Sequence, residues 1–142
     1  MTDIAAVAKT LEEGFSRGAP YEGLVPHLAE TVDIVHHPDR SPNDGPTPRE
    51  TVIRMFREGP NGLGSKVRQT LKRLAVDGER ISAEQDFSVD LNGKTFDIPL
   101  TQVFTFRDGA MVGLGHYPDP AASREFQSAM RDAGAAAQSA GE

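Results

Sequence analysis

Three short turn sequences divide the second half of this chain into four segments. They are Asp77-Gly78, Asn92-Gly93 and Asp108-Gly109. Two-residue hairpin turns favour such pairs, because both central residues adopt a positive φ angle. Short turns leave consecutive strands side by side and antiparallel. We therefore predict an antiparallel meander whose strands cover residues 66–77, 80–91, 95–106 and 111–117.

The first half of the chain favours helices. Apolar residues recur at the spacing of one helical face over residues 3–17, with Asp3 as the cap and Gly18 as the stop. The sequence Thr47-Pro48-Arg49-Glu50 is typical of a helix that begins with a capping box, with the threonine as the cap. The other predicted elements are helices over residues 21–29 and 121–133 and a strand over residues 31–37.

This order of elements predicts a single α+β domain. A curved antiparallel sheet would wrap around three N-terminal helices as a cone-shaped α+β barrel, with a C-terminal helix after it. A chain of 142 residues has the length of one domain that buries its own core. We expect the domain to span residues 1–133, and the Ala- and Gly-rich residues 134–142 to form a flexible tail.

Composition narrows the classes of function. The chain has no cysteine, which excludes disulfides, thiol nucleophiles and thiolate metal sites and suits a reducing cytoplasm. A formal net charge of −6 argues against nucleic acid or an anionic membrane as a partner. No apolar stretch approaches the roughly 20 residues of a spanning helix. We expect a cytoplasmic protein whose partners include neither nucleic acid nor a membrane.

Strand alternation places three polar residues among apolar neighbours. Gln85 and Gln102 share their faces with aliphatic and phenylalanine side chains, and His116 shares its face with Val112 and Leu114. An unpaired buried polar group costs about 1–3 kcal/mol. His116 is the strongest candidate for proton transfer, and the two amides suit holding a substrate oxygen. Two alternatives stay open: a histidine bonded to a neighbouring carbonyl, and two glutamines that bond each other to complete a core.

Two local motifs accompany this order of elements. They are Gly-Pro-Thr-Pro-Arg-Glu-Thr-Val at residues 45–52 and Val-Phe-Thr-Phe-Arg-Asp-Gly-Ala-Met-Val at residues 103–112. Over nearly its whole length the chain resembles the nuclear-transport-factor-two-like superfamily, which includes SnoaL-type polyketide cyclases, ketosteroid isomerases and limonene epoxide hydrolases. The resemblance implies a homodimer through the outer sheet face, where Thr101, Val103 and Thr105 form a β-branched strip. It also implies an apolar cavity, and we expect its substrate-binding residues to be Gln85, His36, Phe15, Phe56, Leu100 and Phe104.

The catalytic residues of these relatives are not matched here. Leu11 and Gln102 stand where ketosteroid isomerases have a tyrosine and a neutral aspartate. Ala83, Gln85 and His116 stand where epoxide hydrolases have their Asp-Arg-Asp group. The cyclase pattern of an aspartate shortly after an aromatic residue is matched only loosely, by residues 117–119. A literal transfer of any of the three mechanisms is therefore rejected.

The adjacent histidines His36 and His37 must point to opposite sides of a strand. Alternation with the preceding apolar residues favours His36 on the inner face, whereas the register of the resembled family favours His37. We predict His37 inside, since twist and bulging are common where a strand ends before a proline, with Asp33 as its partner if that carboxylate also turns inward. A solvated strand end is the alternative. No third ligand stands at a recognisable spacing, so we expect no metal site.

These residues predict a small enzyme that needs no cofactor. It would be an isomerase, cyclase, dehydratase or epoxide-opening enzyme acting by acid–base chemistry on an apolar substrate such as a polyketide or terpenoid, with His116, His37 and Gln102 as the catalytic residues. The alternative is a non-catalytic small-molecule-binding or accessory dimeric module of the same fold. Convergence of His116, one of the paired histidines and Gln102 on one cavity would favour the enzyme.

Overall fold

The computed structural model describes residues 3–37, 44–58, 67–91 and 93–140. Its helices are α1 (Ile4–Ser16), the 3₁₀ helix η1 (Glu22–His27), α2 (Arg49–Glu58) and α3 (Pro120–Ala140). Its strands are β1 (Leu28–His36), β2 (Gly45–Pro48), β3 (Val67–Asp77), β4 (Arg80–Leu91), β5 (Lys94–Arg107) and β6 (Ala110–Pro118). None of the described helices is long and apolar enough to span a membrane.

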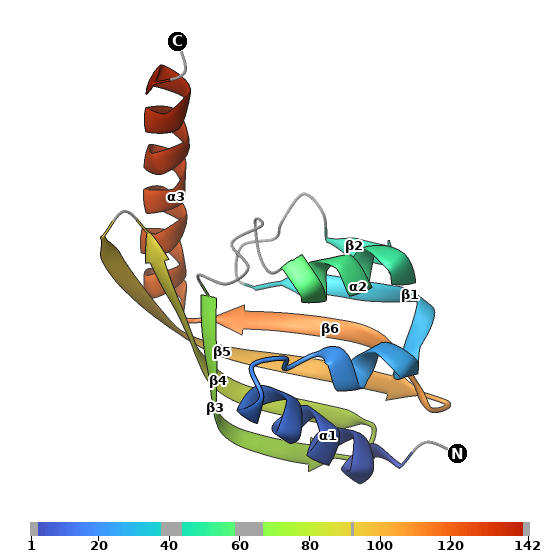
Figure 1. Ribbon diagram of the computed structural model, residues 1–142. Coiled ribbons are helices and arrows are strands. Elements are labelled where there is room, and N and C mark those ends of the chain that lie inside the picture. Colours follow the sequence, from blue (N-terminus) through green and yellow to red (C-terminus); the bar gives the residue numbers. More distant parts are fainter. Residues whose placement is uncertain (1–2, 38–43, 59–66, 92, 141–142) are drawn as a thin grey trace.

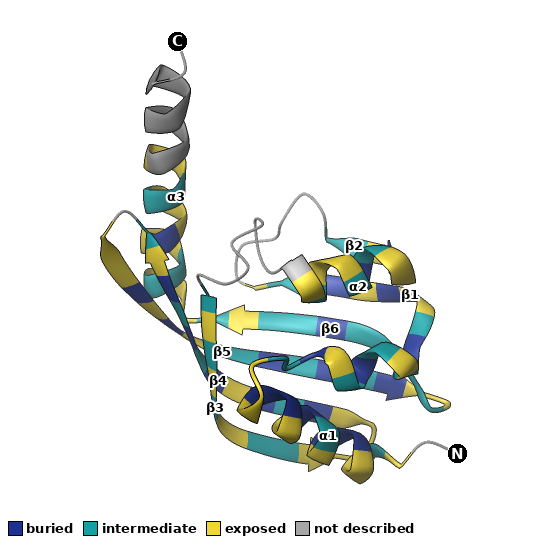
Figure 2. Ribbon diagram, in the orientation of Figure 1, coloured by how far each residue is buried: buried dark blue, intermediate teal, exposed yellow. Residues whose placement is uncertain are grey.

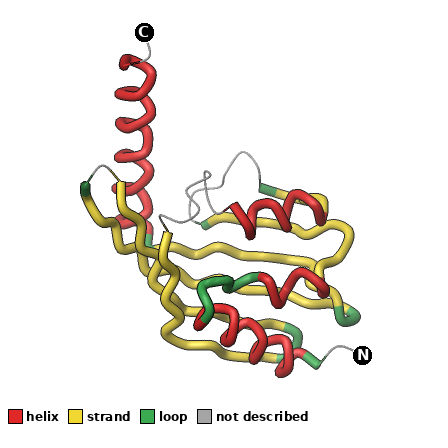
Figure 3. The backbone as a smooth tube through the Cα atoms, viewed as in Figure 1, coloured by secondary structure: helices red, strands yellow, loops and turns green. Residues whose placement is uncertain are grey.

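The strands form one curved, unclosed sheet in the order β2-β1-β6-β5-β4-β3. The helices α1, η1 and α2 lie against one face of this sheet, and α3 stands apart beside the turn between β4 and β5 (Figure 1). The predicted cone-shaped α+β fold is thereby confirmed. Figure 3 shows that strands make up most of the chain between α2 and α3.

One strand pair departs from the predicted antiparallel sheet. All neighbouring strands are antiparallel except β1 and β6, which pair in parallel. No short turn joins these two strands, because α2 and four other strands lie between them in the sequence. Without a tight connection, nothing forces neighbours to run in opposite directions.

The hairpin turns form where the sequence predicts them. Gly78 and Gly93 have φ angles of 58° and 80°, and the pair Asp108 and Gly109 has φ angles of 52° and 81°. Positive φ at both residues of the last pair is the requirement of a two-residue hairpin turn. The meander of β3 to β6 follows from these local signals.

The N-terminal helix also matches its prediction. The Asp3 side chain accepts a hydrogen bond of 3.0 Å from the backbone N–H of Ala5, and Gly18 follows the helix with a φ angle of 76°. The predicted second helix is shorter and of the 3₁₀ type, and β1 begins at Leu28 rather than at residue 31.

The predicted start of the third helix is wrong. Thr47 does not cap a helix: residues 45–48 pair with β1 as the edge strand β2, and α2 begins at Arg49. The buried Thr47 hydroxyl donates a hydrogen bond to the carbonyl of Gly45. Pairing with β1 gives the backbone N–H and C=O groups of residues 45–48 hydrogen-bond partners, which a helix start at Thr47 would not provide. At the other end of the chain, α3 continues beyond Ala133 to Ala140.

Buried residues gather in two clusters (Figure 2). The larger cluster fills the space between α1, η1, α2 and the inner sheet face, and it includes Leu11, Leu24 and Phe104, each with none of its surface exposed. The smaller cluster joins the far ends of β4 and β5 to Phe126 of α3. Alternation holds along β4 and β5, so that Gln85 and Gln102 are buried with their apolar neighbours.

Candidate active site

A row of polar side chains crosses three neighbouring strands on the inner face. His36 of β1 is in register with His116 of β6, and His116 is in register with Gln102 of β5. Side chains that stand opposite each other on adjacent strands have their Cβ atoms about 5 Å apart. The histidine of the first strand that stands next to His116 is therefore His36.

The prediction that His37 turns inward is wrong. His37 is exposed, and its ring stacks on the ring of Tyr117 with a centroid distance of 4.5 Å and an interplanar angle of 1°. The irregularity of β1 lies earlier, between Leu28 and Asp33, so alternation is intact up to the end of the strand. Asp33 is also exposed and forms no pair with the inner histidine.

The partner of His36 is Asp44, which sequence reasoning missed. One carboxylate oxygen lies 2.5 Å from Nδ1 of His36, and the other accepts a 2.8 Å hydrogen bond from the backbone N–H of the same residue. The Asp44 side chain is 6% exposed, so the pair is shielded from water on the carboxylate side. His36 and Asp44 are eight residues apart in the sequence, and a spacing of this kind does not indicate a contact unless the fold is known. Residues 38–43, which stand between the two histidines and Asp44 in the sequence, lie outside the described residues.

His116 is held as a neutral imidazole. Its ring centroid lies 4.9 Å from that of His36, with an angle of 55° between the rings. The pKa of His116 is lowered to about 4, mainly by burial and also by the neighbouring His36, while the Asp44 carboxylate acts in the opposite direction. Neither ring nitrogen of His116 has a hydrogen-bond partner among the described residues, so both are available to a ligand.

Gln102 belongs to a buried hydrogen-bond network (the glutamine network) with Gln85, Gln69 and Tyr21. The Oε1 atom of Gln102 accepts from Nε2 of Gln85 at 2.7 Å and from the hydroxyl of Tyr21 at 2.7 Å. Nε2 of Gln69 donates to Oε1 of Gln85 at 2.8 Å and to the hydroxyl oxygen of Tyr21 at 2.5 Å. The two predicted glutamines do bond each other, as one of our alternatives required.

Tyr21 and Gln69 were absent from the predicted site. Burial raises the pKa of Tyr21 to about 12, although its bonds to the three glutamines act in the opposite direction. Its phenol therefore stays protonated near neutral pH and can donate. No local signal marks Tyr21, since it stands in a short connection, and Gln69 falls in a strand whose alternation is interrupted between Leu71 and Arg73.

The predicted aromatic cavity wall is packed around Tyr21. The ring of Phe56 stacks on that of Tyr21 at 4.7 Å, while Phe15 and Phe104 lie 6.2 and 6.3 Å away. These three phenylalanines therefore contact the glutamine network from the apolar side. Leu100 is buried in the smaller cluster, away from this ring group.

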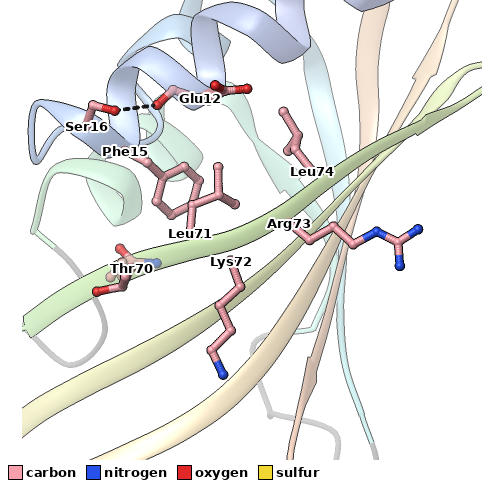
Figure 4. Close-up of a pocket in the computed structure, with 9 residues that line it drawn as sticks. Glu12, Phe15, Ser16, Thr70, Leu71, Lys72, Arg73 and Leu74 are labelled. Carbon is pink, nitrogen blue, oxygen red and sulfur yellow. Dashed lines mark hydrogen bonds between the residues drawn. The ribbon is translucent and has the colours of Figure 1, made fainter.

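Two hollows adjoin the glutamine network. One, of about 540 Å³, lies between α1 and β3 and is lined by Phe15, Gln69, Leu71 and Leu74 among others (Figure 4). The other, of about 330 Å³, is lined by Gln85, Leu100 and Tyr117 among others. His116 and Gln102 line neither of these two hollows. Among the described residues, no three histidine or carboxylate side chains are grouped as metal ligands would be.

Solved structures place this architecture in the class of nuclear-transport-factor-two-like (NTF2-like) folds. An NTF2-like protein of unknown function from Burkholderia pseudomallei is 21% identical, with 89% of this chain and 97% of that chain covered and a TM-score of 0.63. A candidate polyketide cyclase from Acidithiobacillus ferrooxidans is 15% identical, with 90% and 99% covered and a TM-score of 0.63. TerC, co-crystallised with polyporic acid, is 20% identical, with 83% and 93% covered and a TM-score of 0.61.

The family follows from the sequence itself. The sequence model of the SnoaL-like domain matches residues 7–114, which is most of the chain. The chain therefore belongs to the SnoaL-like domain family within the nuclear-transport-factor-two-like superfamily, as the resemblance implied. Among curated proteins, no sequence matches it.

Proposed function

We propose that this protein is a cofactor-independent enzyme that moves a proton next to the carbonyl group of an apolar, polyketide-like substrate. The observation that carries the proposal is the pair of His36 and Asp44 beside the neutral His116 on the inner sheet face. Enolisation requires a base that removes the proton and a hydrogen-bond donor that stabilises the enolate oxygen. A histidine oriented by a carboxylate, next to an uncharged donor, supplies both.

His36 is the proposed base. Nδ1–H of His36 donates a hydrogen bond to the Asp44 carboxylate, so the neutral ring carries its lone pair on Nε2. When Nε2 takes a proton, the carboxylate stabilises the imidazolium that forms. His116 suits this role less than we expected from the sequence, because an imidazole with a pKa of about 4 has little driving force to accept a proton.

His116 and Gln102 are the proposed donors to the substrate oxygen. A neutral imidazole has one N–H, and Nε2 of Gln102 has no hydrogen-bond partner among the described residues. When the C–H bond next to the carbonyl breaks, its proton passes to His36 and its electron pair forms an enolate. The enolate oxygen then accepts hydrogen bonds from both donors. Return of the proton at another carbon gives isomerisation, and attack of the enolate carbon on a second carbonyl gives cyclisation.

The proposal is tested by deuterium exchange into β-tetralone, an apolar ketone, followed by proton NMR in deuterium oxide. His36→Gln should lower the enzymatic exchange rate by about 10²–10⁴-fold, the usual effect of removing a general base. His37→Gln is the matched control, because it removes the neighbouring histidine from the opposite face and should leave the rate unchanged.

Two results would contradict this assignment. Equal losses in the two histidine variants would mean that exchange does not occur on the inner face. Binding of β-tetralone without exchange above the buffer rate would favour the alternative, a non-catalytic module that binds small molecules.

A further inference from the structure

We propose that Gln69 determines whether the site binds a substrate oxygen that only accepts hydrogen bonds or one that also donates. Gln69 has this effect although it lies three strands away from His116. It does so by setting the direction of the hydrogen bonds that end at Gln102. Strands β3 and β6 are separated by β4 and β5, which places them about 14 Å apart. The inference rests on the proposed function only in that the substrate oxygen is taken to sit beside His116.

All hydrogen bonds of the glutamine network run in one direction. Gln69 donates twice, through both hydrogens of its Nε2, to Tyr21 and to Gln85. Tyr21 and Gln85 each accept one of these bonds and donate one onward. Both chains of hydrogen bonds end at Gln102, because its Oε1 accepts from Tyr21 and from Gln85.

This direction turns the amide nitrogen of Gln102 toward the site. Both lone pairs of its Oε1 are used within the network, and its Nε2 has no partner among the described residues. Every fully buried side-chain nitrogen and oxygen of the described residues has a partner, so this unpartnered nitrogen must be reachable by solvent. It therefore offers N–H groups beside His116, which suits an oxygen that accepts, such as a ketone or an enolate.

The same four side chains allow one other complete arrangement. If all three amides turn over, each bond forms again with its donor and acceptor exchanged, and Gln102 presents Oε1 to the site. Turning one amide alone would bring nitrogen against nitrogen or oxygen against oxygen, so the direction changes as a unit. Tyr21 serves either direction because its hydroxyl both donates and accepts, and its pKa of about 12 keeps it protonated.

Gln69 is the member through which the direction can be changed. It is half-buried and lines the hollow between α1 and β3, whereas Gln85 and Gln102 are 1% and 5% exposed. A carboxylate at position 69 can only accept hydrogen bonds. Gln69→Glu should therefore force Tyr21 and Gln85 to donate toward β3 and should turn the oxygen of Gln102 toward His116.

NMR of the side-chain amide of Gln102 tests the direction without any substrate. In the wild-type protein, the amide protons of Gln102 should show nuclear Overhauser effects to the His116 ring. In Gln69→Glu these contacts should move to Tyr21. Thr70→Glu is the control, because it adds the same charge at the neighbouring exposed position and should keep the wild-type pattern. Gln69→Met, which has no hydrogen-bonding group, should populate both arrangements.

A matched pair of ligands tests the selectivity. Fluorenone and fluorenol have the same ring system and differ in whether the oxygen only accepts or also donates. The wild-type protein should prefer fluorenone, and Gln69→Glu should shift the ratio of dissociation constants by about tenfold or more toward fluorenol. Gln69→Met should bring the ratio near one, and Thr70→Glu should leave it unchanged.

The proposal is overturned if the wild-type amide protons of Gln102 already contact Tyr21. It is equally overturned if the Gln69 variants that fold keep the wild-type contacts and ligand ratio, or if the wild-type protein binds neither probe. Its outcome is separate from that of the exchange experiment. Loss of exchange activity tests His36 as a base, whereas the orientation of the Gln102 amide is read in the resting protein.

Discussion

Lowering the pH from about 7 to about 4 should destabilise the folded protein through His116. Burial and the neighbouring His36 lower the pKa of this imidazole from 6.5 to about 4. Between these values the unfolded chain binds a proton that the folded protein does not, so the free energy of unfolding falls as the pH falls. The contribution is fully present above pH 6.5 and is lost by about pH 4. The pKa difference corresponds to at most about 3 kcal/mol, because the ring keeps some contact with solvent.

The assay compares wild-type protein with His116→Gln in urea, at a series of pH values. The chain has no tryptophan, so unfolding is followed by far-ultraviolet circular dichroism. Carboxylates elsewhere also titrate in this range, but they affect both proteins alike. The difference between the two free energies of unfolding should therefore change by up to about 3 kcal/mol in favour of the variant. His37→Gln should follow the wild-type curve, because His37 is exposed.

Parallel curves for wild-type and His116→Gln would refute the reasoning. They would mean that His116 titrates at the same pKa in the folded and unfolded states. The ring would then be hydrated rather than buried, and a neutral donor beside His36 would no longer be available for the proposed chemistry.

Two further predictions concern packing and assembly. Leu11→Ala should lower the free energy of unfolding by about 2–5 kcal/mol in urea, since this side chain is fully buried, whereas Lys9→Ala on the exposed face of the same helix should change it by less than about 0.5 kcal/mol. We also propose that the outer face around Val103 forms a homodimer, so sedimentation at micromolar concentration should give the mass of two chains, and Val103→Lys should give one. A wild-type monomer under these conditions would contradict the dimer.

Much of the inner face could be predicted because its signals are local. The Asp-Gly and Asn-Gly pairs specify hairpins, and a period of two along β4 and β5 assigns Gln85 and Gln102 to the buried side whatever the rest of the chain does. The same rule favours His36 over His37. The prediction of His37 as the inner histidine was wrong because the register of the resembled family was preferred to the alternation of this chain.

The tertiary structure decided which of these residues meet. The parallel pairing of β1 with β6 sets His36 beside His116, and no turn or periodicity encodes a pairing between strands so far apart in the sequence. The contact of Asp44 with His36 follows from the pairing of β2 with β1, which overrode a local helix-start signal. Tyr21 and Gln69 join Gln102 because a buried polar atom must find a partner, and the fold alone determines which side chains are within reach.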